Sequence, residues 1–174
     1  RAEPRKTHLL TAGDFTRPAE EVTPGVLSVL HAFKPDQGPV NRLDLARWIA
    51  SKDNPLTARV TVNHLWQMLF GQGLVRTTED LGLQGERPLH PELLDWLAVD
   101  LVEHGWDLKR TLKLIVMSES YRQDSAVTPT LLAKDPENKL LARGARFRLP
   151  SWMIRDAALR TAGIFNPALG GPPV

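Results

Sequence analysis

Cysteine is absent from this sequence of 174 residues. Its absence excludes disulfide bonds, thiolate nucleophiles, zinc sites with cysteine ligands and the Cys-x-x-Cys-His attachment of c-type haem. Long hydrophobic runs are also lacking, since no apolar stretch approaches the roughly 20 residues of a membrane-spanning helix. Neither sign of charge is in large excess, because 22 Lys and Arg face 20 Asp and Glu, for a formal net charge of +2. This balance gives no global electrostatic footprint for nucleic acid or anionic membranes.

Local catalytic and nucleotide-binding motifs are missing as well. The sequence has no G-x-S-x-G, no G-x-G-x-x-G and no phosphate-binding P-loop. The five histidines stand at positions 8, 31, 64, 90 and 104. No two of them have the spacing of metal ligands on one helix, so we predict no metal site and no cofactor in this stretch of chain.

Residues 1–40 are rich in proline and glycine, with five prolines and three glycines. Proline at this density prevents helix propagation, and only Thr7–Thr11 is typical of a strand. We therefore predict an extended Pro/Gly-rich arm over 1–40, packed on a helical domain over 41–174. The packing is expected because the arm carries apolar residues that need burial, namely Leu9, Leu10, Phe15, Val22, Val26, Leu27, Val29, Leu30 and Phe33.

From Asn41 onward the apolar residues recur with helical periodicity, between capping residues and glycine stops. We predict helices over Asn41–Asp53, Asn54–Phe70, Pro91–Gly105, Asp107–Tyr121, Ser151–Ala162 and, less regularly, Pro136–Ala142. The predicted fold class is mainly α, a compact helical domain of about five or six helices with the Pro-rich arm. Trp48, Trp66 and Trp96 are expected in its core, and 74–89 is expected to be an ordered loop of the kind in which sites often lie.

Polar side chains on the second predicted helix are the best candidates for a site. Arg59, Asn63 and Gln67 are four residues apart and share one face. They could bind a ligand, or they could hold the backbone of the 74–89 loop; the second interpretation is favoured because most side-chain hydrogen bonds go to backbone or water. Adding the neighbouring histidine and the charged loop residues, the candidate binding residues are Arg59, Asn63, His64, Gln67, Asp80, Glu86 and Arg87. No catalytic residue is assigned.

Twelve runs of residues, spread over nearly the whole chain, carry a family resemblance. They are Arg42–Trp48, Asn54–Val60, Asn63–Gln67, Phe70–Val75, Asp80–Gly85, His90–Leu97, Gly105–Asp107, Ser118–Ser125, Asp135–Asn138, Arg148–Pro150, Ile154–Asp156 and Gly170–Pro172. In this order they resemble the planctomycete-type domain of unknown function 1553. His64 departs from the pattern, which more often has Arg there, and Leu81 stands where Phe is usual.

The resemblance implies a module of large bacterial proteins that are exported to the periplasm or cell envelope and often have a c-type haem domain elsewhere in the chain. It implies no established activity. The first residue, Arg1, and the Gly-Gly-Pro-Pro-Val tail also lead us to expect a piece of a longer chain.

Three functions are compatible with these observations. The leading hypothesis is a non-catalytic interaction or scaffold module that contacts other modules of the same protein. The alternative is a carbohydrate-binding or hydrolytic domain with a cleft at the second helix and the 74–89 loop. A weaker alternative is nucleic-acid binding through Lys109, Arg110 and Lys113, which the even charge balance disfavours.

Overall fold

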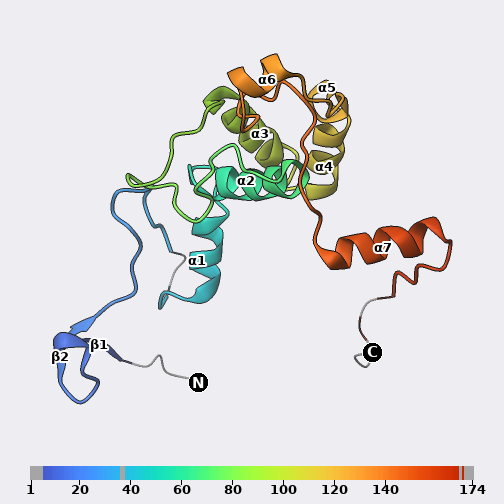
Figure 1. The fold of residues 1–174 in the computed structure, drawn as a ribbon. Helices are drawn as coiled ribbons and strands as arrows, with labels where there is room; N and C mark the ends of the chain where they lie inside the picture. The colour runs from blue at the N-terminus through green and yellow to red at the C-terminus, as the bar shows by residue number, and fades with distance from the viewer. Residues whose placement is uncertain (1–5, 36–37, 169, 171–174) are drawn as a thin grey trace. The chain divides into compact units, whose positions relative to one another are not determined.

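The fold is mainly helical, which confirms the predicted fold class. The computed structural model describes residues 6–35, 38–168 and 170, and within them it has seven α-helices and one two-stranded sheet (Figure 1). The chain divides into two compact units. The first unit comprises 1–62 and 92–106, and the second comprises 63–91 and 107–174. The predicted division into an arm over 1–40 and a helical domain over 41–174 stays a prediction.

The first unit begins with a β-hairpin. Strand β1 (Thr7–Leu10) pairs antiparallel with β2 (Pro18–Val22), and the single-turn 3-10 helix η1 (Thr11–Gly13) lies between them (Figure 1). The strand expected at Thr7–Thr11 is confirmed. Its partner was not predicted, because proline usually argues against a strand; here Pro18 is the first strand residue, where a missing N–H is tolerated.

The expectation that the arm buries its apolar side chains is wrong for five of the nine. Phe15 is 84% exposed and Val29 is 86% exposed, and Leu9, Leu10 and Leu27 are exposed as well. None of the residues of β1 or β2 is buried. A two-stranded hairpin has too little surface to build a core of its own, so Leu9, Leu10 and Phe15 remain in contact with solvent.

Helix α1 (Arg42–Ile49) starts with the predicted cap. The Asn41 side chain accepts hydrogen bonds from the backbone N–H groups of Leu43 and Asp44. The Asp44 carboxylate in turn accepts from the Asn41 N–H at 2.9 Å, which completes a capping box. The helix is shorter than predicted, since a turn over 51–54 replaces its expected last residues.

Helix α2 (Thr57–Phe70) is entered through Asn54, a buried residue whose side-chain oxygen accepts from Leu56 N–H and Thr57 N–H. Gly71 follows the helix with φ +79°, as the predicted glycine stop requires. Helix α3 (Pro91–Glu103) ends before Gly105, which also has positive φ. The buried apolar residues of the first unit come from these helices: Ala58, Val62, Leu94, Leu97, Ala98 and Leu101. The expectation of a core position is wrong for Trp96, which is 54% exposed.

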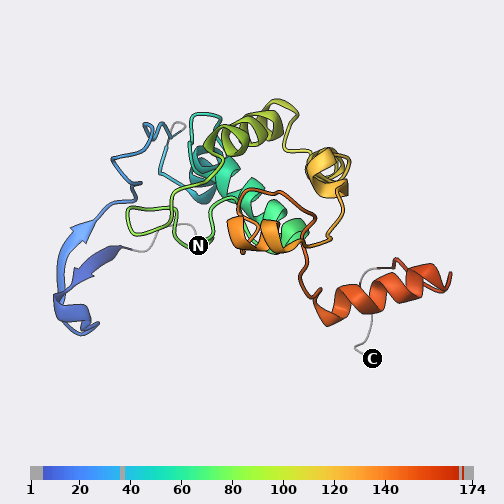
Figure 2. The same ribbon diagram turned by 45° about the horizontal axis from the view of Figure 1, so that its top comes forward.

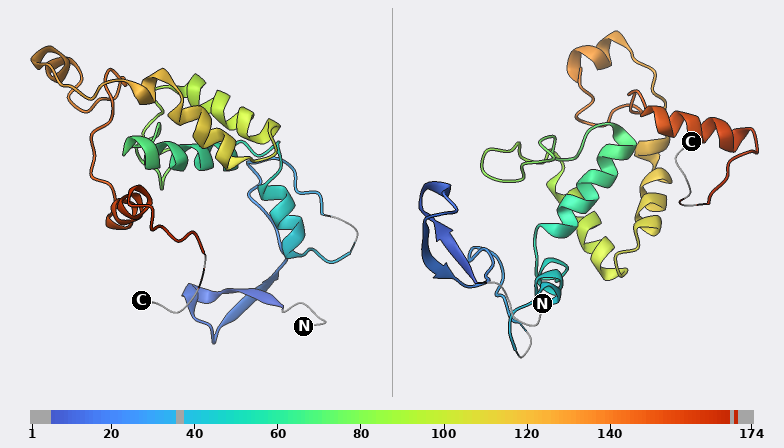
Figure 3. Two further views of the ribbon diagram at one scale, coloured as in Figure 1. Left: turned by 90° about the vertical axis from the view of Figure 1, so that its right-hand side faces the viewer. Right: turned by 90° about the horizontal axis from the view of Figure 1, so that it is seen from below.

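The second unit contains α4 (Leu108–Val116), α5 (Glu119–Arg122), α6 (Pro129–Lys134) and α7 (Ser151–Thr161). One continuous helix to Tyr121 was expected. Instead Ser118 interrupts it, because its hydroxyl donates back to Ile115 C=O at 2.7 Å and accepts from Tyr121 N–H, which makes it the N-cap of α5. Figure 3 shows α4 and α5 as successive helices, and Figure 2 shows α7 after an extended segment.

The helix expected around Pro136–Ala142 is absent, and turns occupy this segment. Helix α6 lies before it instead, capped by Thr128 with Pro129 in its first turn. Buried apolar residues of the second unit are Trp66, Phe70, Leu74, Val75 and Ile115. Across the described ranges, no helix has the length and apolar character needed to cross a membrane. Residues 171–174 of the expected linker tail lie outside the described residues.

Candidate functional site

Asn63 fixes the start of the 74–89 loop. Its side chain is fully buried, its amide nitrogen donates to Val75 C=O at 2.9 Å, and its oxygen accepts from Val75 N–H at 2.8 Å. The carboxamide therefore pairs with Val75 as a strand neighbour would. Gly73 makes room for this contact, since a Cβ there would lie 2.5 Å from Val75 O and 2.7 Å from both polar atoms of Asn63. The favoured interpretation, that this position holds the loop backbone, agrees with these bonds.

Arg59, the next candidate on the same helix, has a different partner. Its Nε donates to Asp95 of α3 at 2.6 Å, and Nη1 donates to Pro55 C=O. This charge-assisted bond raises the pKa of Arg59 and lowers the pKa of Asp95 below the usual range of an aspartate. The pair is more than a third exposed on both sides, so it ties α2 to α3 in the first unit without forming a buried charge site.

The remaining candidates do not converge on one another. His64 is exposed, Gln67 is half-buried, and neither makes a side-chain hydrogen bond among the described residues. Asp80 accepts from Gly82 N–H at 2.7 Å in a local turn of the loop. Glu86 and Arg87 are exposed, and only the Glu86 backbone is bonded, to the Thr77 hydroxyl. Their role in binding stays a prediction.

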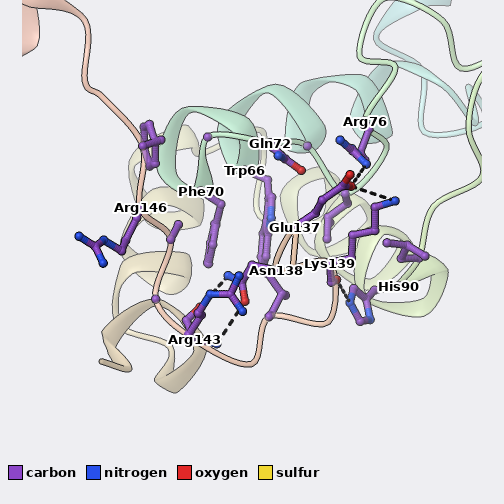
Figure 4. A pocket seen from close by; sticks show the side chains of 18 of the residues that line it. Trp66, Phe70, Gln72, Arg76, His90, Glu137, Asn138, Lys139, Arg143 and Arg146 are labelled. Carbon is purple, nitrogen blue, oxygen red and sulfur yellow. Dashed lines mark hydrogen bonds and ion pairs between the residues drawn. The ribbon is translucent and has the colours of Figure 1, made fainter. Parts of the chain in front are cut away.

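A cavity of about 340 Å³ lies in the second unit, beside the end of α2 (Figure 4). None of the seven candidate residues lines it. Its apolar wall is made by Trp66 and Phe70, whose rings stack with centroids 4.1 Å apart, and Tyr121 meets the edge of Phe70. Gly71 lets Phe147 close one end, since a Cβ on Gly71 would lie 2.7 Å from the Phe147 ring.

The opposite wall is the irregular segment 135–147, which side-chain bonds to backbone hold in place. Arg143 is 7% exposed and donates to the carbonyls of Asp135 and Pro136, both at 2.9 Å. Asn138 donates from its side chain to Arg143 C=O, and the Asp135 carboxylate accepts from the Lys139 and Leu140 N–H groups. These bonds maintain left-handed backbone at Asn138 and at Leu141, a conformation that costs about 1–2 kcal/mol in a residue other than glycine.

Charged groups line the polar side of this cavity. Glu137 forms ion pairs with Arg76 and with Lys139, the second at 3.0 Å (Figure 4). Both cations lower the pKa of Glu137, Lys139 most strongly. The ring of His90 is bonded to Lys139 C=O at 3.2 Å, and Arg146 points away from the two aromatic rings (Figure 4). This cluster was not predicted, because its members come from three segments of the chain, at residue 76, at residue 90 and over 137–146.

Helix α7 is the second feature with functional potential. None of its eleven residues is buried; Trp152 is 60% exposed and Ile154 is 49% exposed. Ile164, just after the helix, is 70% exposed. These exposed apolar side chains offer a partner apolar area that it could cover. No group of three or more histidine, aspartate or glutamate side chains able to hold a metal ion occurs in the part of the chain that the structure describes.

Over the described residues, these features define a mostly helical domain with a polar cavity beside α2 and an exposed helix α7. A family model described as PSD1, protein of unknown function (DUF1553), matches residues 41–174. The chain therefore belongs to this family. No curated protein and no solved structure matches it.

Proposed function

We propose that this chain is a non-catalytic interaction or scaffold module of a multidomain bacterial envelope protein. In this proposal α7 and the β-hairpin pack against other modules of the same protein. The envelope setting and the neighbouring modules come from the family resemblance. The observation that carries the interaction role is the exposure of α7.

An eleven-residue helix is at the lower limit of what the backbone can sustain by itself. Isolated helices shorter than about 12–15 residues are marginal in water, and most helical stability in proteins comes from packing an apolar face. Helix α7 has a good C-terminal stop in Gly163, with φ +74°, but it has no side-chain cap bond at its N-terminus and no buried residue. Burial of Trp152 and Ile154 against a partner would supply about 1.5–3 kcal/mol for each side chain.

The hairpin supports the same role for the first unit. Its Phe15 lies at the tip between the strands with most of its ring in solvent, although a phenylalanine is among the costliest residues to leave exposed. The weaker alternatives have less support: none of the predicted cleft residues lines the cavity beside α2, and Lys109, Arg110 and Lys113 are only three basic residues on α4 in a chain without a large excess of positive charge.

Hydrogen exchange measured on this chain and on a longer protein with its neighbouring modules tests the proposal. We expect the amides of 155–162 to exchange at least tenfold more slowly in the longer protein. Trp152→Ala should remove that protection, whereas Arg155→Ala, an exposed change on the same helix, should leave it in place. Equal exchange in the two proteins would rule out docking of α7.

A further inference from the structure

The cavity beside α2 contains more positive charge than its one lining carboxylate balances. Arg76, Lys139 and Arg143 all line it, and Glu137 is the single acidic residue of the lining. Asp135 lies just behind the wall, but its carboxylate accepts from the Lys139 and Leu140 N–H groups at 2.7 and 2.8 Å. The lining as a whole therefore has a net positive charge.

Arg143 is the most informative of these cations. Arg143 is only 7% exposed, yet among the described residues no carboxylate lies within ion-pair distance of it. Its donors reach only two carbonyl groups, which offset part of the cost of removing a charge from water. A guanidinium in this situation is stabilised by an anion that enters the cavity, and its planar fork suits carboxylate, sulfate and phosphate groups.

Glu137 is shared between two cations. The Arg76 and Lys139 side chains both contact its Oε2, so one carboxylate serves two positive groups; Figure 4 shows the Glu137 carboxylate directed toward these two side chains, on the other side of Trp66 from Phe70. The Glu137 side chain is half-exposed. Its carboxylate can therefore leave Arg76 and Lys139 and be solvated by water when a stronger anion approaches. An incoming anion thus competes with Glu137 for Arg76 and Lys139.

We propose that this cavity binds a small organic oxyanion, that is, a carboxylate, sulfate or phosphate group on a compact body. Arg143, Lys139 and Arg76 supply the charge, and the wall of Trp66 and Phe70 accommodates the body. The volume of about 340 Å³ is at the small end of the range for ligand pockets, about 300–1,000 Å³. A bare inorganic ion would leave the aromatic wall unused. The proposal goes beyond the interaction role of α7 and does not depend on it.

Calorimetric titration of the chain at low salt tests this directly. The probes are benzoate, phenyl sulfate and phenyl phosphate, then glucuronate, glucose 6-sulfate and glucose 6-phosphate, with phenol and glucose as neutral controls and inorganic sulfate and phosphate as bare ions. We expect at least one organic anion to bind tenfold more tightly than its neutral counterpart and than the inorganic ions, and more weakly as salt is added. If no organic anion does so, the proposal is wrong.

Two substitutions with opposite expected effects identify the cavity as the place of binding. Glu137→Gln removes the internal competitor and should tighten anion binding threefold to tenfold. Lys139→Gln should weaken binding by at least a similar factor, and it leaves the buried Arg143 bonds intact. Arg148→Gln, an exposed arginine outside the lining, is the matched control and should change nothing. Circular dichroism confirms folding of each variant; unchanged or weaker binding in folded Glu137→Gln would overturn the assignment.

Discussion

Asn63→Ala is expected to release the start of the 74–89 loop. The substitution removes one donor and one acceptor from a position that is fully buried, opposite Val75, which is 1% exposed. The N–H and C=O groups of Val75 then have no protein partner. A buried polar group that loses its partner costs about 1–3 kcal/mol, so the pair should lower the free energy of unfolding of this region by about 2–6 kcal/mol. That is a large share of the 5–15 kcal/mol typical of a folded domain.

Urea denaturation gives the global loss, and hydrogen exchange of the Val75 amide gives the local one. The amide should exchange at least thirtyfold faster in Asn63→Ala, since each 1.4 kcal/mol corresponds to a factor of ten. Asn63→Asp is a second perturbation: it keeps an acceptor for Val75 N–H but places a carboxylate against Val75 C=O, so it should destabilise as strongly at neutral pH.

Gln67→Ala is the matched control for both measurements. It stands one turn further along α2, carries the same functional group, and makes no side-chain hydrogen bond among the described residues. Its effect should lie within about 0.5 kcal/mol. A loss below about 1 kcal/mol in Asn63→Ala, or equal losses in the two variants, would refute the view that Asn63 holds the loop.

Three further substitutions test other parts of the structure. Gly73→Ala should destabilise the second unit by about 1–3 kcal/mol because its Cβ would overlap Val75 O and the Asn63 side chain, whereas Gly25→Ala, with open space around its Cβ, should be neutral in the same thermal melts. Asp107→Ala should cost about 1 kcal/mol of stability through loss of the N-cap bond to Arg110 N–H, as judged by urea midpoints; an unchanged midpoint would contradict it. The pKa of Asp95 is lowered by Arg59, so the stability that this pair contributes is fully present above the pKa of an unfolded aspartate and is lost as the pH falls through the lower pKa of the folded state. Carboxyl titration by NMR should show the pKa of Asp95 rising in Arg59→Gln. An unchanged pKa would contradict the pairing.

Helices with local start and stop signals could be predicted from the sequence. Asn41 caps α1 as expected, Asn54 accepts hydrogen bonds in the turn that leads into α2, which begins later than predicted, at Thr57, and Gly71, Gly105 and Gly163 end helices because they adopt positive φ. Prediction failed where a side chain competes with the helix backbone. Ser118 is an example: its hydroxyl bonds to the Ile115 carbonyl in the preceding turn. A serine can make this bond or point to solvent in a continuous helix, and the sequence does not distinguish the two.

Burial was harder to predict than secondary structure. Trp96 has helical spacing typical of a core residue, yet it lies on the solvent side of α3. Likewise, the apolar arm residues were expected to be buried, and several are exposed. The sequence shows that a side chain is hydrophobic but does not show whether another segment packs against it. The cavity was missed for a related reason: Arg76 is 61 residues from Glu137 in the chain, and only tertiary structure brings it to the 135–147 segment.

The wall of the cavity formed by 135–147 is ordered without help from a helix or strand. Arg143 and Asn138 cross-link the backbone from within, so the carbonyl and amide groups of this turn are fixed before anything enters. Such preorganisation shifts the entropy cost of association from the protein to the incoming molecule. Ligand binding should therefore restrict few motions of the protein. A rigid ligand should bind more tightly than a flexible one of the same charge, because it loses less conformational entropy on binding.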